Sequence, residues 1–148
     1  MTGRDVQSLD AVARVRRVRE QDSLTGLQLA LREVEASQQH LVAAEGRLAE
    51  LSGQQATTPE AFVALREGLL TLGRTVDVAR ASLESSRNLA VSAQSHWQND
   101  RIRLRTIEML QERREAETRA EEARAQAKVQ DEVATQLWSR HRHLKVVS

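Results

Sequence analysis

The side chains of this sequence that could carry out chemistry are few. The chain has no cysteine, which excludes a thiol nucleophile, a thiolate zinc site and a disulfide framework. Of the four histidines, His141 and His143 are two residues apart in a basic tail, a poor geometry for a metal. The acidic residues have arginine neighbours at helical spacing, and there is no glycine-rich phosphate loop. We therefore predict no catalytic residue, no metal, no cofactor and no small-molecule substrate, so that the protein is not an enzyme.

Arginine is the residue type whose arrangement points to another role. A guanidinium group pairs with carboxylates through two parallel hydrogen bonds. Neither of two arginine clusters keeps to one face of a helix, so together they predict a ring of positive charge, which we call the basic collar. The basic collar consists of Arg14, Arg16, Arg17 and Arg19 with Arg101, Arg103 and Arg105. It suits insertion into an acidic ring or groove; a solvated surface or a weak nucleic-acid patch is the alternative.

The composition indicates which elements must position these side chains. Of 148 residues, 40% are hydrophobic, 29% are charged and only 2% are aromatic. Helix formers dominate and the aromatic strand formers are nearly absent, so the sequence predicts long helices with narrow apolar stripes. The net charge of +1 argues against a general nucleic-acid binder. No apolar run approaches a membrane span, and the arginine-rich opening lacks a signal-peptide core, so we expect a cytoplasmic protein.

One stretch of the sequence reads as a break between helices. Gly53 suits the left-handed residue that follows a helix end, and Thr58 can cap a helix that begins at Pro59. We predict an all-α fold in a single coiled-coil domain over residues 1–148. Its parts are a helix over about residues 6–52, a loop over about 53–58, a helix over about 59–140 and a basic tail over 141–148. The second helix would be roughly 120 Å long.

Heptad spacing predicts how the two helices pair. The a and d positions follow Leu27, Val34, Leu41 and Leu48 in the first helix and Phe62, Leu69, Val76 and Leu83 in the second. A short loop makes the helices antiparallel neighbours, so the fold is a long two-helix coiled-coil hairpin. The register of the two helices can be described by the sum of the residue numbers of two facing residues. Large side chains face small ones when this sum is 113. That register places Leu51 opposite Phe62 and Ala44 opposite Leu69, and it stacks Arg16 on the ring of Trp97.

The second helix is expected to extend beyond the first for about 30 residues. Its apolar stripe there is nearly all alanine, on a helix crowded with charge. A stripe of small residues allows close approach of another molecule, but a merely solvated helix is an equal alternative. The exposed extension stripe comprises Ala116, Ala120, Ala123, Ala127, Leu137 and Trp138.

Four segments give the chain a resemblance to a known family. Residues 9–20 (LDAVARVRRVRE) form a basic opening, and residues 107–114 (IEMLQERR), 117–124 (ETRAEEAR) and 128–134 (KVQDEVA) form a charged second-helix signature. The chain thereby resembles FliJ, the coiled-coil stalk and chaperone component of the bacterial flagellar type III export apparatus. It departs from that pattern at Thr118, where the family often has tyrosine, and in lacking an aromatic residue near the start.

The resemblance implies a function that the residues alone do not give. FliJ-like proteins lie in the pore of the flagellar export ATPase hexamer, contact the export gate protein FlhA and serve motility and chemotaxis. They have also been described as chaperones for export substrates. By this resemblance the basic collar would bind the ATPase ring, and the hairpin tip, with Phe62, Arg66 and Leu69, would bind the gate. The protein would be cytoplasmic, contacting the membrane only indirectly, through the apparatus.

Two other functions remain open from the sequence. One is a generic coiled-coil scaffold that dimerises through the extension stripe. The other is the cognate stalk protein of a virulence type III secretion system. Gene neighbourhood would separate these alternatives from a flagellar export protein.

Overall fold

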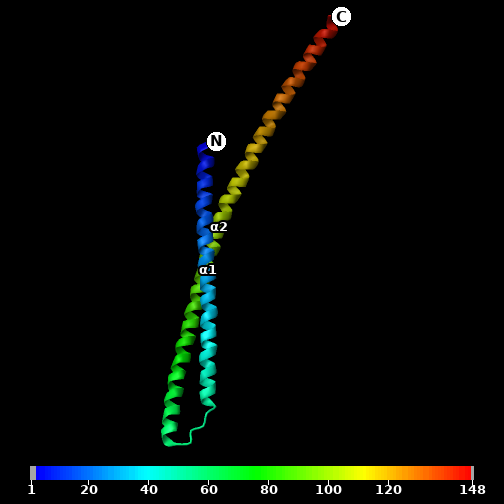
Figure 1. Cartoon of the computed structure of the whole chain (residues 1–148). Helices are drawn as coiled ribbons and strands as arrows, with labels where there is room; N and C mark the ends of the chain where they lie inside the picture. Colours follow the sequence, from blue (N-terminus) through cyan, green and yellow to red (C-terminus); the bar gives the residue numbers. More distant parts are fainter. Residues whose placement is uncertain (1–2, 148) are drawn as a thin grey trace. The chain divides into compact units, whose positions relative to one another are not determined.

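A computed structural model describes residues 3–147 as two helices joined by a short loop. Helix α1 spans Gly3–Ser52 and helix α2 spans Pro59–Val146. Figure 1 shows that the chain reverses at the loop, so that the two helices run antiparallel. No strand is found in the described part of the chain, and α2 is longer than α1. The predicted all-α helical hairpin with a longer second helix is therefore confirmed.

The ends of the helices at the loop follow from local hydrogen bonds. Thr58 caps α2: its Oγ1 accepts the amide of Ala61 at 3.1 Å, and Pro59 begins the helix as predicted. The prediction for Gly53 is wrong, because no described glycine adopts a positive φ. Its amide is instead shared by the carbonyl oxygens of Ala49 and Glu50, each at 3.2 Å. The helix therefore ends in a right-handed turn.

The outer ends of both helices lie beyond the predicted bounds. Helix α1 begins at Gly3, and α2 continues to Val146, so residues 141–146 are helical although the sequence predicted a tail there. No glycine or proline follows Gly73 to interrupt α2. His143 and Lys145 occupy the last turn, where positive charge is favourable beside the free carbonyl groups of a helix end.

The chain divides into two compact units, which we describe separately. The hairpin unit is Arg14–Leu104 and contains the loop; the terminal unit combines residues 3–13 with residues 105–147. In the terminal unit Ala13 is fully buried, and the amide nitrogen of Gln111 donates to Asp10 Oδ1 at 2.7 Å. Every residue described after Arg114 is exposed. Neither helix has a stretch apolar enough to cross a membrane within the described residues.

The core of the hairpin unit is the line of a and d residues along both helices, which we call the seam. Buried positions recur at alternating spacings of three and four residues, as the heptad pattern predicted. The buried apolar residues of the hairpin unit are Leu27, Ala44, Val76, Leu83 and Ala90. Ser37, Ser86 and Asp100 are buried in the same lines, so the seam is interrupted by polar layers.

The register between the helices differs from the predicted one by a heptad. Two hydrogen bonds across the seam define the register, which we express as the sum of the two residue numbers in a facing pair. The sum is 123 for Ser37 and Ser86, and it is 117 for Glu20 and Trp97. The mean of these two sums is 120, whereas the matching of large with small side chains predicted a sum of 113. Periodicity defines a register only modulo seven, and the 113 register would place Ser37 against Val76. A buried hydroxyl without a partner costs about 1–3 kcal/mol, so pairing of polar groups outweighs the matching of side-chain sizes.

The corrected register changes the loop end of the hairpin. Ala44 now lies level with Val76, and these side chains are only 2% and 4% exposed. Leu51 packs on Gly68, with its Cδ2 atom 3.0 Å from where a Cβ on that glycine would lie. The predicted contact between Leu51 and Phe62 is therefore wrong. Phe62 lies outside the seam and is 58% exposed.

The register predicts which engineered disulfide can form. Cysteines at Ala44 and Val76 face each other across the seam and should cross-link in high yield under mild oxidation, because facing seam positions approach disulfide range. Cysteines at Ala44 and Leu69 are displaced by seven residues, about 10 Å along the axis, and should remain reduced. Mobility on a non-reducing gel distinguishes the two variants. Efficient cross-linking of the second pair alone would contradict the register.

Candidate functional site

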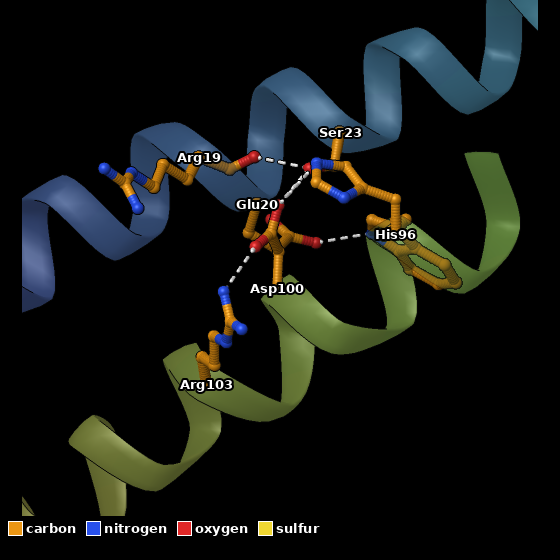
Figure 2. Close-up of polar contacts among 7 residues, drawn as sticks. Arg19, Glu20, Ser23, His96, Asp100 and Arg103 are labelled. Atoms are coloured by element: carbon orange, nitrogen blue, oxygen red, sulfur yellow. Dashed lines mark hydrogen bonds and ion pairs between the residues drawn. The ribbon is translucent and has the colours of Figure 1, made fainter. Parts of the chain in front are cut away.

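A polar cluster interrupts the seam where the two helices carry their arginines. It consists of Glu20 and Ser23 from α1 with Trp97 and Asp100 from α2. Asp100 is 5% exposed and accepts a hydrogen bond from the hydroxyl of Ser23, whose oxygen also lies 2.9 Å from the carbonyl oxygen of Arg19. Figure 2 shows Ser23 approaching Asp100 from α1, while His96 and Arg103 approach it from α2.

The surroundings of Asp100 favour its ionised form. His96 Nε2 lies 3.5 Å from Oδ2, and Arg103 Nη1 lies 4.0 Å from Oδ1. The hydrogen bond from Ser23 is the main cause that holds the pKa of Asp100 below its ordinary value of 3.8; burial opposes it, and the charges of His96, Arg103 and Arg16 act in the same direction as the hydrogen bond. The polar cluster therefore contains a buried carboxylate at neutral pH.

Trp97 links the polar cluster to the surface. Its Nε1 donates to Glu20 Oε1 at 2.9 Å, and the guanidinium carbon of Arg101 lies 5.3 Å from the ring centroid. The predicted stacking of Arg16 on Trp97 is therefore wrong, and Arg101 takes that place. The Nη1 atom of Arg16 is buried without a hydrogen-bond partner among the described residues, within range of the negative charge of Asp100.

The sequence contained a signal for this cluster that the wrong register obscured. Glu20, Ser23 and Asp100 are polar residues at seam positions, and such residues are usually paired when buried. In the 113 register Asp100 faces Ala13 and has no partner on α1, although His96 and Arg103 of its own helix remain within reach. In the observed register it meets Ser23.

The structure places most of the basic collar in the hairpin unit. The register brings Arg101 and Arg103 level with Arg19 and Arg17. No described residue forms an ion pair with Arg14, Arg17 or Arg19, all of which are exposed. These three side chains are therefore available to carboxylates of another molecule.

Arg105, by contrast, lies in the terminal unit and already has acidic partners. Its Nη1 lies 3.1 Å from Glu112 and 3.7 Å from Glu108. Among the described residues it forms two ion pairs, whereas Arg103 forms one, with Asp100 at 4.0 Å.

The residues predicted for the hairpin tip lie on one stripe of α2. Phe62 and Arg66 are exposed, while Leu69 is half-buried where the seam begins. Beside them is a hollow of about 320 Å³ lined by Leu51 and Leu65 together with loop residues. The tip thus presents an uncovered aromatic ring and a guanidinium group one helical turn apart.

The extension stripe lies uncovered in the terminal unit. Ala116, Ala120, Ala123 and Ala127 are exposed, and Leu137 and Trp138 are 60% and 63% exposed. The guanidinium carbon of Arg142 lies 5.1 Å from the Trp138 ring centroid. Nearer to α1, a groove of about 510 Å³ is lined by Val6, Leu9, Arg114 and Thr118 among others.

The described residues offer charge and shape rather than reactive groups. They contain no group of three or more metal-ligating side chains. The hydroxyl of Ser23 donates to the carboxylate of Asp100, which is a weak base because its pKa is lowered. What the site presents is a set of exposed guanidinium groups, held in place by a paired polar seam.

The polar cluster predicts a defined response of stability to pH. Because the folded-state pKa of Asp100 is lowered, its ionised form stabilises the fold above about pH 4, and this contribution is lost as pH falls through the folded-state value. Asp100→Asn should therefore lower the free energy of unfolding at pH 7, and the difference from the parent should shrink towards pH 3. Urea unfolding of both proteins at pH 7, 5 and 3 measures this. A constant difference would contradict the assignment.

Comparison of the chain with known protein families gives a match over most of its length. The model of the flagellar FliJ protein family matches residues 6–143, which is nearly the whole chain. No curated protein and no solved structure is significantly similar to the chain.

Proposed function

The chain belongs to the flagellar FliJ protein family, and we propose that it serves flagellar protein export as a non-enzymatic stalk inserted in the export ATPase ring. Membership of this family supports a role in the flagellar export apparatus in general. The stalk stimulates the ATPase and couples it to the export gate. Its partners in this proposal are the ATPase hexamer and the gate protein FlhA.

The observation that carries the proposal is the exposed part of the basic collar. Arg14, Arg17 and Arg19 project from α1 without an acidic partner in the described chain. Arg101 and Arg103 lie level with them on α2, so positive charge is distributed over both helices. An acidic surface that surrounds the hairpin would pair with these groups. The polar cluster beneath them holds the two helices in the register that aligns the arginines.

The opposite end of the hairpin is suited to the export gate. Phe62 and Arg66 are exposed at the loop end, and Leu69 continues their stripe into the seam. Aromatic and arginine side chains dominate the binding energy of many protein interfaces. We assign FlhA to this tip because the basic collar and the tip lie at different levels of α2.

The remaining roles follow from the same assignment. The protein is cytoplasmic, held at the inner face of the cell membrane through the export apparatus rather than by direct contact. Its helices could also escort export substrates or their chaperones, and through export it would support motility and chemotaxis.

A second candidate function is supported by the uncovered extension stripe. Four alanines at heptad-like spacing allow another helix to approach closely, as in a dimeric coiled-coil scaffold. A stalk in a virulence type III secretion system would use the basic collar in the same way. Gene neighbourhood separates these alternatives.

The basic collar predicts a charge-dependent interaction. Replacing Arg14, Arg17 and Arg19 together by glutamate should abolish stimulation of the cognate export ATPase and impair motility, while leaving the helices formed, because the three side chains are exposed. Binding by the parent should weaken with salt, since the screening length is about 10 Å at 0.1 M. ATPase rates and circular dichroism measure both effects.

A matched control distinguishes the effect of where the arginines lie from the effect of the change in net charge. Arg32, Arg47 and Arg74 are also exposed, and changing all three to glutamate makes the same change in net charge elsewhere. This control should stimulate the ATPase as the parent does. If the triple collar variant also does so, the basic collar is only a solvated surface. If the parent itself neither binds nor stimulates the ATPase, the stalk function is wrong and the scaffold replaces it.

A further inference from the structure

Next to the basic collar, both helices lose their charge. Residues 23–31 of α1 and residues 88–99 of α2 contain no Asp, Glu, Lys or Arg, in a chain that is 29% charged. We call these two segments the neutral belt. Both lie in the hairpin unit.

The register brings the two neutral segments together. Leu27 and Ala90 are buried at seam positions in the middle of the belt, at 9% and 8% exposure. Residues 23–31 lie level with residues 89–97, so Asp, Glu, Lys and Arg are absent from both helices at the same height. The one histidine there, His96, points to the edge of the belt, where its Nε2 lies 3.5 Å from Asp100 Oδ2. The other long neutral segment of α1, residues 36–44, has no such counterpart, because α2 carries Asp77, Arg80 and Glu84 opposite it. The neutral belt is thus a property of the paired helices rather than of either sequence alone.

Exposed aliphatic side chains of the belt lie on one side of the hairpin. Arg87 donates to Gln38 at 3.2 Å across this side. Leu31 precedes Gln38 by one heptad and Val91 follows Arg87 by one helical turn, so both share that side. They are 54% and 64% exposed.

The other side of the hairpin carries a similar pair. A hollow on that side, where the belt meets the basic collar, is lined by Asp22, Gly26, Ala93 and His96 together with the charged residues Arg19, Asp100 and Arg103. Leu29 follows Asp22 by one heptad, and Leu89 precedes His96 by one heptad. They are 58% and 64% exposed. Leucine and valine are therefore uncovered on two opposite sides.

We propose that the neutral belt is the contact surface for an uncharged, apolar sleeve of protein that surrounds the two helices. This inference rests on the proposed function, and the sleeve would be formed by the ATPase ring next to its acidic contacts with the basic collar. A partner that binds one side, such as a second copy of the chain, would need only one of the two aliphatic pairs. A partner that contacts both aliphatic pairs through apolar groups must surround the two helices.

The absence of charge has a physical consequence for such a contact. Apolar contact is non-directional and depends on the area removed from water. The subunits of a ring could then exchange places against the belt without breaking an ion pair. The basic collar would supply attraction to the ring, and the belt would supply a contact that does not depend on angle.

Two pairs of lysine substitutions test the two sides of the neutral belt separately. Leu29→Lys with Leu89→Lys charges one side of the belt, and Leu31→Lys with Val91→Lys charges the other. Because a lysine ammonium group must lose its hydration in an apolar sleeve, each pair should weaken binding to the purified export ATPase by about tenfold or more. Val42→Lys with Val78→Lys is the matched control, since these exposed residues lie on both helices outside the belt. The control should bind within about twofold of the parent.

Each outcome bears on the inference. Weakening by only one belt pair would indicate a one-sided partner and would overturn the sleeve, as would equal weakening by all three pairs or by none. A parent that is dimeric in solution and becomes monomeric in either belt variant would show that the belt covers a second copy instead. A parent that does not bind the ATPase contradicts the proposed function itself, whereas a binding parent with unaffected belt variants contradicts the belt alone. Circular dichroism verifies that each variant remains helical.

Discussion

The pairing of buried and half-buried polar groups across the seam is the constraint on which the rest of the structure depends. Asp100 meets Ser23, Trp97 meets Glu20, and Ser37 meets Ser86, and these pairs are compatible with one register only. Sliding one helix by a heptad preserves the periodicity of the apolar residues but separates every one of these partners. The slide would remove the hydrogen bond from Ser23 to Asp100 and would leave the buried Ser37 hydroxyl without its partner, and an unpaired buried polar group costs about 1–3 kcal/mol. Ser23 and Ser86 would keep carbonyl acceptors in their own helices, at 2.9 and 3.0 Å. The pairing of Asp100 and Ser37 therefore selects among registers that apolar packing alone nearly equates.

This one constraint determines where the surface features lie. It aligns Arg101 and Arg103 with the arginines of α1, and it aligns the uncharged segments of the two helices beside them. It also leaves Phe62 beyond the end of the seam, as an uncovered aromatic ring at the tip. The features proposed to bind the ATPase ring and the gate thus depend on the same buried pairs, although none of those pairs contacts a partner.

Much of the fold could be predicted because helices carry their signals locally. The heptads through Leu27 and Val76 located the seam, and Thr58 with Pro59 located the start of α2. The register could not be found from periodicity, since a seven-residue repeat is unchanged by a shift of seven. Judging the register by side-chain size placed Asp100 opposite Ala13, although a buried carboxylate demands a partner. The same error assigned Arg16 to Trp97, and the left-handed turn at Gly53 failed because a right-handed end satisfied its amide equally well.

The most direct test is to remove the polar pairs and measure the register. Spin labels at the exposed positions Glu35 and Ser85, which lie level, report the axial offset of the helices in the hairpin unit. The parent should give one distance. A variant with alanine at Ser23, Ser37, Ser86 and Asp100 should give a second population, displaced along the axis by one heptad, or about 10 Å. If that variant keeps the single distance of the parent, apolar packing or the loop fixes the register, and the central role assigned to the polar pairs is contradicted.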